Sequence, residues 1–300
     1  MELQNRVNVV DYENALQSIT RSSKAFLVIK NGSCDLSLSK IPHGVSVYHG
    51  DKGWDLISNT LSSKYEYDVE NNLEFDLIIE FDSLLKIKEP LYVIFLDGDS
   101  AKSEKVYRNC YLMGDDSQIT IIEKQLSEFD NDNQQTLNMF SSWFLGKNTA
   151  LTHYGFELPN KMPNLSINNN IIIRQRESSS CCFFSFYWEQ GTTNNKIEVV
   201  LSGEFSNCKI FSASLLSKST IVNNNIRVNH NAPNCESLQV YKGVYNDNSS
   251  SKFDSLVYVK QDAQKTSSIQ QNNNIILSDY ASVKSNPQLE IFADDVKCSH

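Results

Sequence analysis

The chain has 300 residues, enough for one large domain or two ordinary ones. Its composition, 40% apolar and 21% charged, is ordinary for a globular protein, and its net charge is −9. No block of Lys or Arg stands out, which argues against nucleic acid as a partner, because phosphate binding needs clustered positive charge. No apolar run approaches the roughly 20 residues needed to span a bilayer, so no membrane partner is expected.

Seven cysteines are scattered at irregular spacings. No pair of Cys-x-x-Cys knuckles occurs, which argues against a structural zinc site. The first 16 residues carry several charges and lack the continuous apolar core of a secretory signal. We therefore expect a cytoplasmic protein with reduced thiols.

The amino-terminal part, to about residue 61, shows no sustained repeat. Residues 9–20 place apolar side chains at roughly helical spacing, which predicts a helix. Residues 37–48 alternate more like a strand.

From about residue 74 onward, short apolar runs recur between polar turns, and each has the length of a strand. The clearest runs are residues 75–79, 91–96, 119–122, 171–173, 182–188, 197–201, 210–216, 256–259, 275–277 and 289–292. A helical insert is expected at about residues 132–143. Many short strands at close spacing indicate a sandwich, a barrel or a β-solenoid, and periodicity alone does not choose among them.

One recurrence favours the solenoid. Three Asn-Asn-Asn triplets, residues 168–170, 223–225 and 272–274, each precede an Ile. Asn side chains stacked at the turns of successive coils can form a hydrogen-bonded ladder. Compositional bias toward Asn is an equally good explanation of the triplets.

Metal-binding chemistry concentrates at Cys298 and His300. In an extended strand, residues two apart project to the same face, so this pair can hold one metal ion. Thiolate and imidazole both bind iron in iron–sulfur proteins, but a cluster needs about four protein ligands, so a second chain would have to supply the others. Lys297 is expected to lower the pKa of the Cys298 thiol. The alternative is a packed cysteine beside a surface histidine.

Other candidate residues have simpler explanations. Asp294 and Asp295 suggest acid–base work or calcium binding, but neighbouring strand residues face opposite sides, so a turn role is preferred. The pair His230 and Cys235 is interpreted as core or turn structure in preference to a second metal site. His153 is interpreted as structural. No G-x-x-x-x-G-K-[ST] loop is present, so hydrolysis of a nucleotide by this chain is not expected.

Five segments, in order, resemble the SufB/SufD family of the SUF iron–sulfur cluster assembly system. They are Ser117-Gln-Ile-Thr-Ile-Ile-Glu123; Asn148-x-x-Leu-x-His-Tyr154; His230-x-x-Pro-x-Cys-x-Ser237 followed by Tyr241-Lys-Gly243; Asp262-Ala-Gln-Lys-Thr266; and Pro287-Gln-Leu-Glu-Ile-Phe-Ala-Asp-Asp-Val-Lys-Cys-Ser-His300. Together they are spread over about 185 residues. No clear match precedes about residue 90.

The resemblance implies a mainly β fold, with a right-handed parallel β-helix core over residues 75–300 and a small, variable, partly helical amino-terminal region over residues 1–74. It also implies a non-catalytic scaffold that pairs with a SufB-like protein, while a separate SufC-like ATPase hydrolyses ATP. The nascent Fe–S cluster would be held transiently at the interface with the SufB-like partner. His300 would be the ligand from this chain, with Cys298 beside it.

Within the family, the short amino-terminal region is more typical of SufD than of SufB. The family motif continues beyond the position of His300 into more β-helix and a helical region that docks SufC, so that region is expected to be missing here. Two alternatives stay open: a β-helical carbohydrate-active enzyme that uses Asp294 and Asp295, and a structural SufB partner without cluster chemistry.

Overall fold

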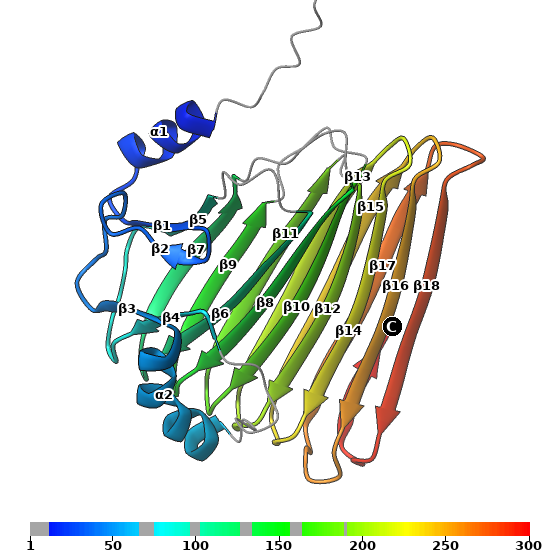
Figure 1. The fold of residues 1–300 in the computed structure, drawn as a ribbon. Helices are drawn as coiled ribbons and strands as arrows, with labels where there is room; N and C mark the ends of the chain where they lie inside the picture. The colour runs from blue at the N-terminus through cyan, green and yellow to red at the C-terminus, as the bar shows by residue number, and fades with distance from the viewer. Residues whose placement is uncertain (1–11, 66–74, 97–102, 127–133, 157–163, 189–190) are drawn as a thin grey trace, which may run out of the picture.

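A computed structural model describes residues 12–65, 75–96, 103–126, 134–156, 164–188 and 191–300. In these residues two long sheets face each other, one of ten strands and one of nine (Figure 1). We call the ten-stranded sheet, which contains β1, β2 and the odd-numbered strands from β5 to β19, sheet A. The nine-stranded sheet, with β3 and the even-numbered strands from β4 to β18, is sheet B.

The strands of sheet A are β1 (Phe26–Lys30), β2 (Ser33–Cys34), β5 (Leu91–Leu96), β7 (Gln118–Gln125), β9 (Ala150–Phe156), β11 (Ser180–Trp188), β13 (Asn207–Leu216), β15 (Glu236–Tyr245), β17 (Thr266–Ile276) and β19 (Val296–Ser299). Those of sheet B are β3 (Val45–His49), β4 (Leu77–Phe81), β6 (Glu104–Met113), β8 (Gln135–Leu145), β10 (Leu165–Gln175), β12 (Thr192–Leu201), β14 (Ile221–His230), β16 (Ser250–Val259) and β18 (Ser282–Ile291).

From β4 onward, successive strands alternate between the two sheets. Each strand from β6 to β17 pairs in parallel with the strands two before and two after it. A sandwich built from hairpins would instead pair neighbours in sequence antiparallel. The chain therefore winds as a parallel β-solenoid of about seven turns, which confirms the expected mainly β, β-helical fold. Antiparallel pairing is found only where β1 meets β2 and β3 meets β4 among the named strands of the described residues.

Residues nearer the amino terminus add to one end of both sheets. Strand β1 pairs in parallel with β5, and β3 pairs with β4. Two helices cover the outer faces at this end: α1 (Tyr12–Ser22) packs over β1 and β5 through Ile19, and α2 (Gly50–Tyr65) packs over sheet B through Ile57 and Leu61 (Figure 1). The helices thereby bury apolar side chains that would otherwise be exposed on the outside of the first coils.

The main core fills the lumen between the two sheets. Alternation along each strand produces this arrangement, because successive side chains point to opposite faces. On β14, Val222, Asn224, Ile226, Val228 and His230 are buried, whereas the residues between them are partly or fully exposed. The lumen is thus mainly apolar but includes polar side chains that need hydrogen-bond partners inside.

Turns at one end of the coils stack on one another. The backbone N–H of Asn148 donates to Glu177 O of the next coil at 3.0 Å, and that of Ser178 donates to Glu204 O at 2.8 Å. Left-handed backbone conformations recur in these turns, as at Asp116 and Asn148. Asp and Asn tolerate that conformation better than most residues, which helps explain the polar breaks between apolar runs.

Asparagine side chains form two ladders on sheet B. The outer ladder joins Asn138, Asn168, Asn194 and Asn223 through amide hydrogen bonds, each of 2.9 Å. The inner ladder joins Asn169, Asn195 and Asn224 through bonds of 2.9 and 2.8 Å. The predicted stacking thus occurs, but in the middle of strands and not at turns. The triplet at residues 272–274 lies on sheet A, apart from both ladders.

Three local predictions need correction or adjustment. The helical insert expected at residues 132–143 is wrong: residues 132–133 lie outside the described residues, and β8 begins at Gln135. Strand structure within residues 37–48 begins only at Val45, apart from an isolated bridge at Lys40. The predicted first helix is present as α1, with residues 9–11 outside the described residues.

Candidate functional site

The residues that carried the sequence prediction meet at the end of the solenoid that contains β19. A bend at Asp294 and Asp295 leads into this strand. The backbone of Asp295 is held by Gln264, whose side-chain oxygen accepts from Asp295 N at 2.9 Å, and by Lys265, whose N–H donates to Asp295 O at 2.6 Å. The two carboxylates therefore occupy a turn, as expected, and that turn joins the stack formed by earlier coils.

Cys298 lies in register with Ser268 on β17 and is half-buried, packing against the lumen core. Burial raises the pKa of the Cys298 thiol, and a backbone hydrogen bond from Ser268 opposes this effect only in part. The expectation that Lys297 lowers this pKa is wrong, because Lys297 is exposed and desolvation of the thiol dominates.

His300 follows the end of β19 and is exposed. By strand alternation it continues the side of β19 that carries Cys298, while Lys297 and Ser299 face the other way. In the described ranges, no three His, Cys, Asp or Glu side chains gather closely enough to hold a metal ion. The ligand role of Cys298 and His300 stays a prediction.

Beneath Cys298, the lumen contains a chain of buried polar groups. Ser268 Oγ lies 2.8 Å from Ser237 Oγ, which lies 2.9 Å from His230 Nε2. Thr266 Oγ1 is 3.5 Å from the other ring nitrogen, and Thr266 also donates to Ala263 O. Desolvation lowers the pKa of His230 to about 4, so this imidazole is neutral near pH 7. Polar residues from two separate sequence motifs thus converge on one column beneath Cys298, which belongs to a third.

His230 and Cys235 are both fully buried, but each has its own hydrogen-bond partners. The Cys235 thiol lies 3.3 Å from Ser206 Oγ and donates to Gly203 O at 3.3 Å. This arrangement confirms the interpretation of the pair as core and turn structure. All seven cysteines are free thiols.

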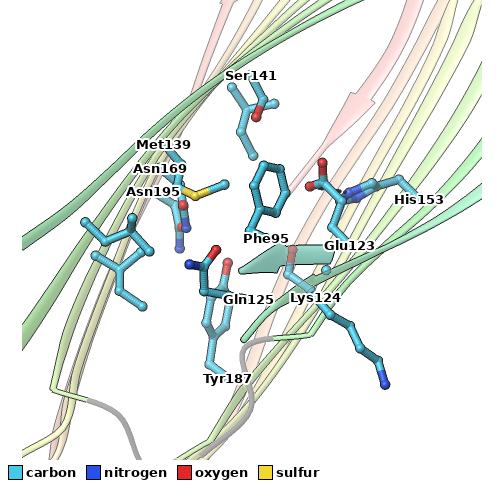
Figure 2. A pocket seen from close by; sticks show the side chains of 15 residues that line it. Phe95, Glu123, Lys124, Gln125, Met139, Ser141, His153, Asn169, Tyr187 and Asn195 are labelled. Atoms are coloured by element: carbon cyan, nitrogen blue, oxygen red, sulfur yellow. Dashed lines mark hydrogen bonds and ion pairs between the residues drawn. The ribbon is translucent and has the colours of Figure 1, made fainter. Parts of the chain in front are cut away.

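A second group of polar residues lies deeper in the lumen, beside a cavity of about 90 Å³ (Figure 2). Glu123 on β7 and His153 on β9 contact each other there, with 2.9 Å between Oε2 and Nε2. The Tyr111 hydroxyl donates to the other carboxylate oxygen of Glu123. His153 thus has a structural contact, as expected, but its carboxylate partner was not predicted.

The signal for that partner was present in the sequence. Glu123 is the last residue of the first family-like segment, and His153 is the residue before the last in the second. The two are 30 residues apart. Once the length of a coil is known, that spacing places them on neighbouring strands of one sheet. The sequence alone did not give the coil length.

Comparison with known proteins gives a consistent result. Residues 96–300 match the family model described as SUF system FeS cluster assembly, SufBD core domain. The chain is 39% identical over 100 residues to the iron-sulfur cluster assembly protein SufD of Escherichia coli strain K12, which covers 33% of this chain and 24% of that protein. It is 24% identical over 224 residues to an iron-sulfur cluster assembly SufBD family protein of Synechocystis sp., which covers 72% of this chain and 49% of the relative.

The aligned regions thus span about half or less of the length of these curated relatives. Within the helices that the structure describes, none is long and apolar enough to cross a membrane.

Proposed function

This chain belongs to the SufBD core domain family of the SUF system, and from that membership we propose that it is a non-catalytic scaffold component of iron–sulfur cluster assembly. The observation that carries the proposal is the convergence of the family-like motifs on one end of the lumen. Ser237, Thr266 and Cys298 come from three different motifs and lie on adjacent strands of sheet A there. A few buried polar groups gathered within a mainly apolar core are typical of a functional site.

In this proposal the chain acts as the SufD-type partner of a SufB-like protein. The 39% identity to a SufD protein supports that choice over SufB. His300 serves as a ligand to a nascent cluster, which is cargo shared between the two chains and not a resident cofactor. Because one exposed imidazole and one half-buried thiol are fewer than the roughly four ligands that a cluster needs, the partner supplies the rest.

In this proposal Cys298 has a smaller part in the site than His300, for a physical reason. A metal ligand must be a thiolate, whereas burial raises the pKa of this thiol and packs it against the core. We therefore assign the ligand role first to His300 and a supporting role to Cys298.

The proposal also includes an external ATPase of the SufC type and a cytoplasmic setting, both from family membership. Neither Asp294 nor Asp295 needs a catalytic role to explain its presence, since both lie in a stacked turn whose backbone is fixed by Gln264 and Lys265. A carbohydrate-active enzyme is therefore the weaker alternative.

The test is His300→Ala in this protein, purified in complex with the proposed SufB-like and SufC-like partners. We expect complex formation to be unchanged and cluster assembly, followed by visible absorption under anaerobic conditions, to fall by at least about tenfold, because imidazole binds iron directly. The free energy of unfolding should change by no more than about 0.5 kcal/mol, as for other exposed side chains.

Two further variants sharpen this test. Ser299→Ala, at the exposed last residue of β19 beside His300, is the matched control and should assemble clusters normally. Cys298→Ala should abolish assembly if the thiol is a ligand, and should lower stability while leaving assembly largely intact if it only packs. Normal assembly by the His300→Ala complex would refute the ligand role.

A further inference from the structure

The outer face of sheet A is apolar in the middle of the solenoid. Strands β11, β13 and β15 place nine side chains on this face in three rows, which the register of the strands aligns. We call these nine residues the sheet A patch: Phe184, Phe186, Trp188, Phe211, Ala213, Leu215, Val240, Lys242 and Val244. Eight of the nine are apolar, and all nine are at least partly exposed. The outward positions of a strand with one solvated face are usually polar.

The opposite face of the same coils provides a comparison within one molecule. Strands β12, β14 and β16 of sheet B also place nine in-register side chains outward: Asn194, Lys196, Glu198, Asn223, Asn225, Arg227, Lys252, Asp254 and Leu256. Leu256 is the one apolar residue among these nine. The position of a strand along the solenoid therefore does not explain the sheet A patch. A contiguous group of exposed apolar side chains is typical of an interaction surface.

Stacking within the sheet accounts for only part of the patch. Phe184 stacks on Tyr154 with 4.8 Å between ring centroids, and on Phe211 with 5.0 Å. Trp188 and Leu215 take no part in this stack, and they are 41% and 45% exposed. A groove of about 470 Å³ runs over small residues such as Ala213, between the stacked rings and the side chains of Phe186 and Lys242. Apolar side chains of another molecule can enter this groove.

The kind of molecule that fits follows from backbone hydrogen bonding. Each of β11, β13 and β15 pairs with a strand on both sides, so the patch has no free edge to which a strand could be added. A helix satisfies its own backbone groups and can lay an apolar stripe on such a face. Helix α1 already does so on this sheet, where it covers Phe26, Val28 and Ile94 (Figure 1). Of the two helices in the described ranges, α1 packs over β1 and β5 and α2 over sheet B, so neither covers the patch.

The charges around the patch favour an acidic partner. Outward positions of β7, β13 and β15 carry Lys124, Lys209 and Lys242, and Figure 2 shows Lys124 pointing away from the lumen. Glu236 is the one acid at an outward position in the strands of sheet A from β7 to β17. None of these three lysines forms an ion pair with another described residue. A face with three cations and one acid, on a chain of net charge −9, is complementary to an acidic surface.

We propose that the sheet A patch is the docking surface for an amphipathic α-helix of a partner protein, with an apolar stripe flanked by Asp or Glu. The stripe lies over Phe211 and Leu215 and places a side chain in the groove above Ala213. The flanking carboxylates pair with Lys209 and Lys242. This surface is on β11 to β15, whereas Cys298 is on β19, so the contact differs from the one proposed at the end of the solenoid and does not depend on it.

The probes are two synthetic helical peptides of about 18 residues, or roughly five turns. Both carry Leu at i, i+3, i+4 and i+7 spacing. One carries Glu on both sides of the Leu stripe, and the other carries Lys at the same positions. Isothermal titration calorimetry with the purified protein measures the two affinities. We expect the Glu peptide to bind at least about fivefold more tightly, because several exposed ion pairs add small contributions.

Three variants locate the binding surface. Lys242→Glu should weaken binding of the Glu peptide and strengthen binding of the Lys peptide, each by at least about threefold, because it turns attraction into repulsion. Ala213→Gln fills the groove without adding charge and should weaken both peptides. Lys196→Glu makes the same change of charge at an exposed position on sheet B, and it is the matched control that should bind both peptides as the parent does. Circular dichroism shows whether each variant has folded.

Several results would overturn the proposal. Absence of binding by both peptides would do so, as would equal affinity of the parent for the Glu and Lys peptides. Equal effects of Lys242→Glu and Lys196→Glu would show that the peptides respond to net charge and not to the sheet A patch. Sedimentation equilibrium of the parent and of Ala213→Gln tests a second copy as the occupant. A dimer of the parent that Ala213→Gln dissociates would assign the patch to self-association and would refute a partner helix.

Discussion

Burial sets the ionisation of the histidine beneath the end of the solenoid. The pKa of His230 is lowered from 6.5 to about 4 by desolvation, and its two nearest polar partners, Ser237 and Thr266, are uncharged. A neutral imidazole can accept from one hydroxyl and donate to the other, which a doubly protonated ring cannot do. Protonation of His230 at acidic pH therefore lowers the stability of the folded chain.

We predict a pH-dependent stability that His230→Gln removes. Between pH 6.5 and about 4 the unfolded chain binds a proton at His230 that the folded chain does not, so the free energy of unfolding falls as pH falls through this window. The difference between the two pKa values corresponds to a loss of about 3 kcal/mol in the free energy of unfolding. Urea unfolding of both proteins at pH 7 and pH 4.5 measures it. The advantage of the parent over His230→Gln should shrink at pH 4.5, and an advantage that stays constant would contradict the assigned burial effect.

Cys298 and His300 could be proposed as ligands from sequence because a single short segment contains both, and their ligand role stays a prediction. The contact between Glu123 and His153 could not be predicted in the same way, because it depends on which residues of neighbouring coils share a register. The ionisation of Cys298 was wrongly predicted for a related reason. Sequence placed it next to Lys297, whereas the fold exposes Lys297 and packs the thiol against the core.

Individual strands were largely foreseen because apolar runs bounded by polar turns are a strong signal. Strand β8 was missed because its two faces are both covered near its end. Trp143 and Leu145 face the lumen, while Phe144 packs under α2 beside Tyr65. Apolar residues on both faces remove the alternation by which a half-exposed strand is distinguished from a helix.

The two asparagine ladders on sheet B allow a matched comparison between buried and exposed hydrogen bonds. Asn195 is buried in the inner ladder, where it accepts from Asn169 and donates to Asn224. Asn195→Ala leaves both neighbours without that partner inside the lumen, at a cost of about 2–4 kcal/mol. The adjacent Asn194 lies in the partly exposed outer ladder, where water can replace the lost bonds. Asn194→Ala should therefore cost less than about 1 kcal/mol.

Urea unfolding of these two variants measures the difference. Equal costs for Asn194→Ala and Asn195→Ala would mean that burial does not govern the strength of the ladders. If both variants lose less stability than expected, the backbone hydrogen bonds between strands hold the coils together without help from asparagine.

For the whole molecule, the spacing between coils sets a limit on side-chain size at the turns. A Cβ atom at Gly203 would lie 1.9 Å from the backbone nitrogen of Glu177 in the preceding coil. At Gly155, which lies within the lumen, the nearest atom would be His153 Cε1 at 3.5 Å, an ordinary contact. Two glycines of the same solenoid thus differ in whether the fold requires them.

We predict that Gly203→Ala forces two coils apart and lowers the free energy of unfolding by about 3 kcal/mol, in line with other overpacked positions. Gly155→Ala should change it by less than about 1 kcal/mol. Thermal or urea unfolding of both variants checks this, and full stability of Gly203→Ala would show that the turn stack adjusts freely.

The overall architecture followed from the sequence only in outline. Short strands and repeated turns indicated several all-β folds, and family resemblance chose the solenoid. The number of coils is hard to predict from the sequence because each coil pairs only with the coils next to it. No pairing within a single coil indicates how many residues it contains.

The asparagine ladders also have a direction. Each amide of the outer ladder donates to the coil before it, from Asn194 to Asn168, whereas each amide of the inner ladder donates to the coil after it, from Asn195 to Asn224. The two rows of side-chain dipoles therefore oppose each other along the axis of the solenoid. Their fields largely cancel, so the ladders join neighbouring coils without creating a potential gradient along the lumen.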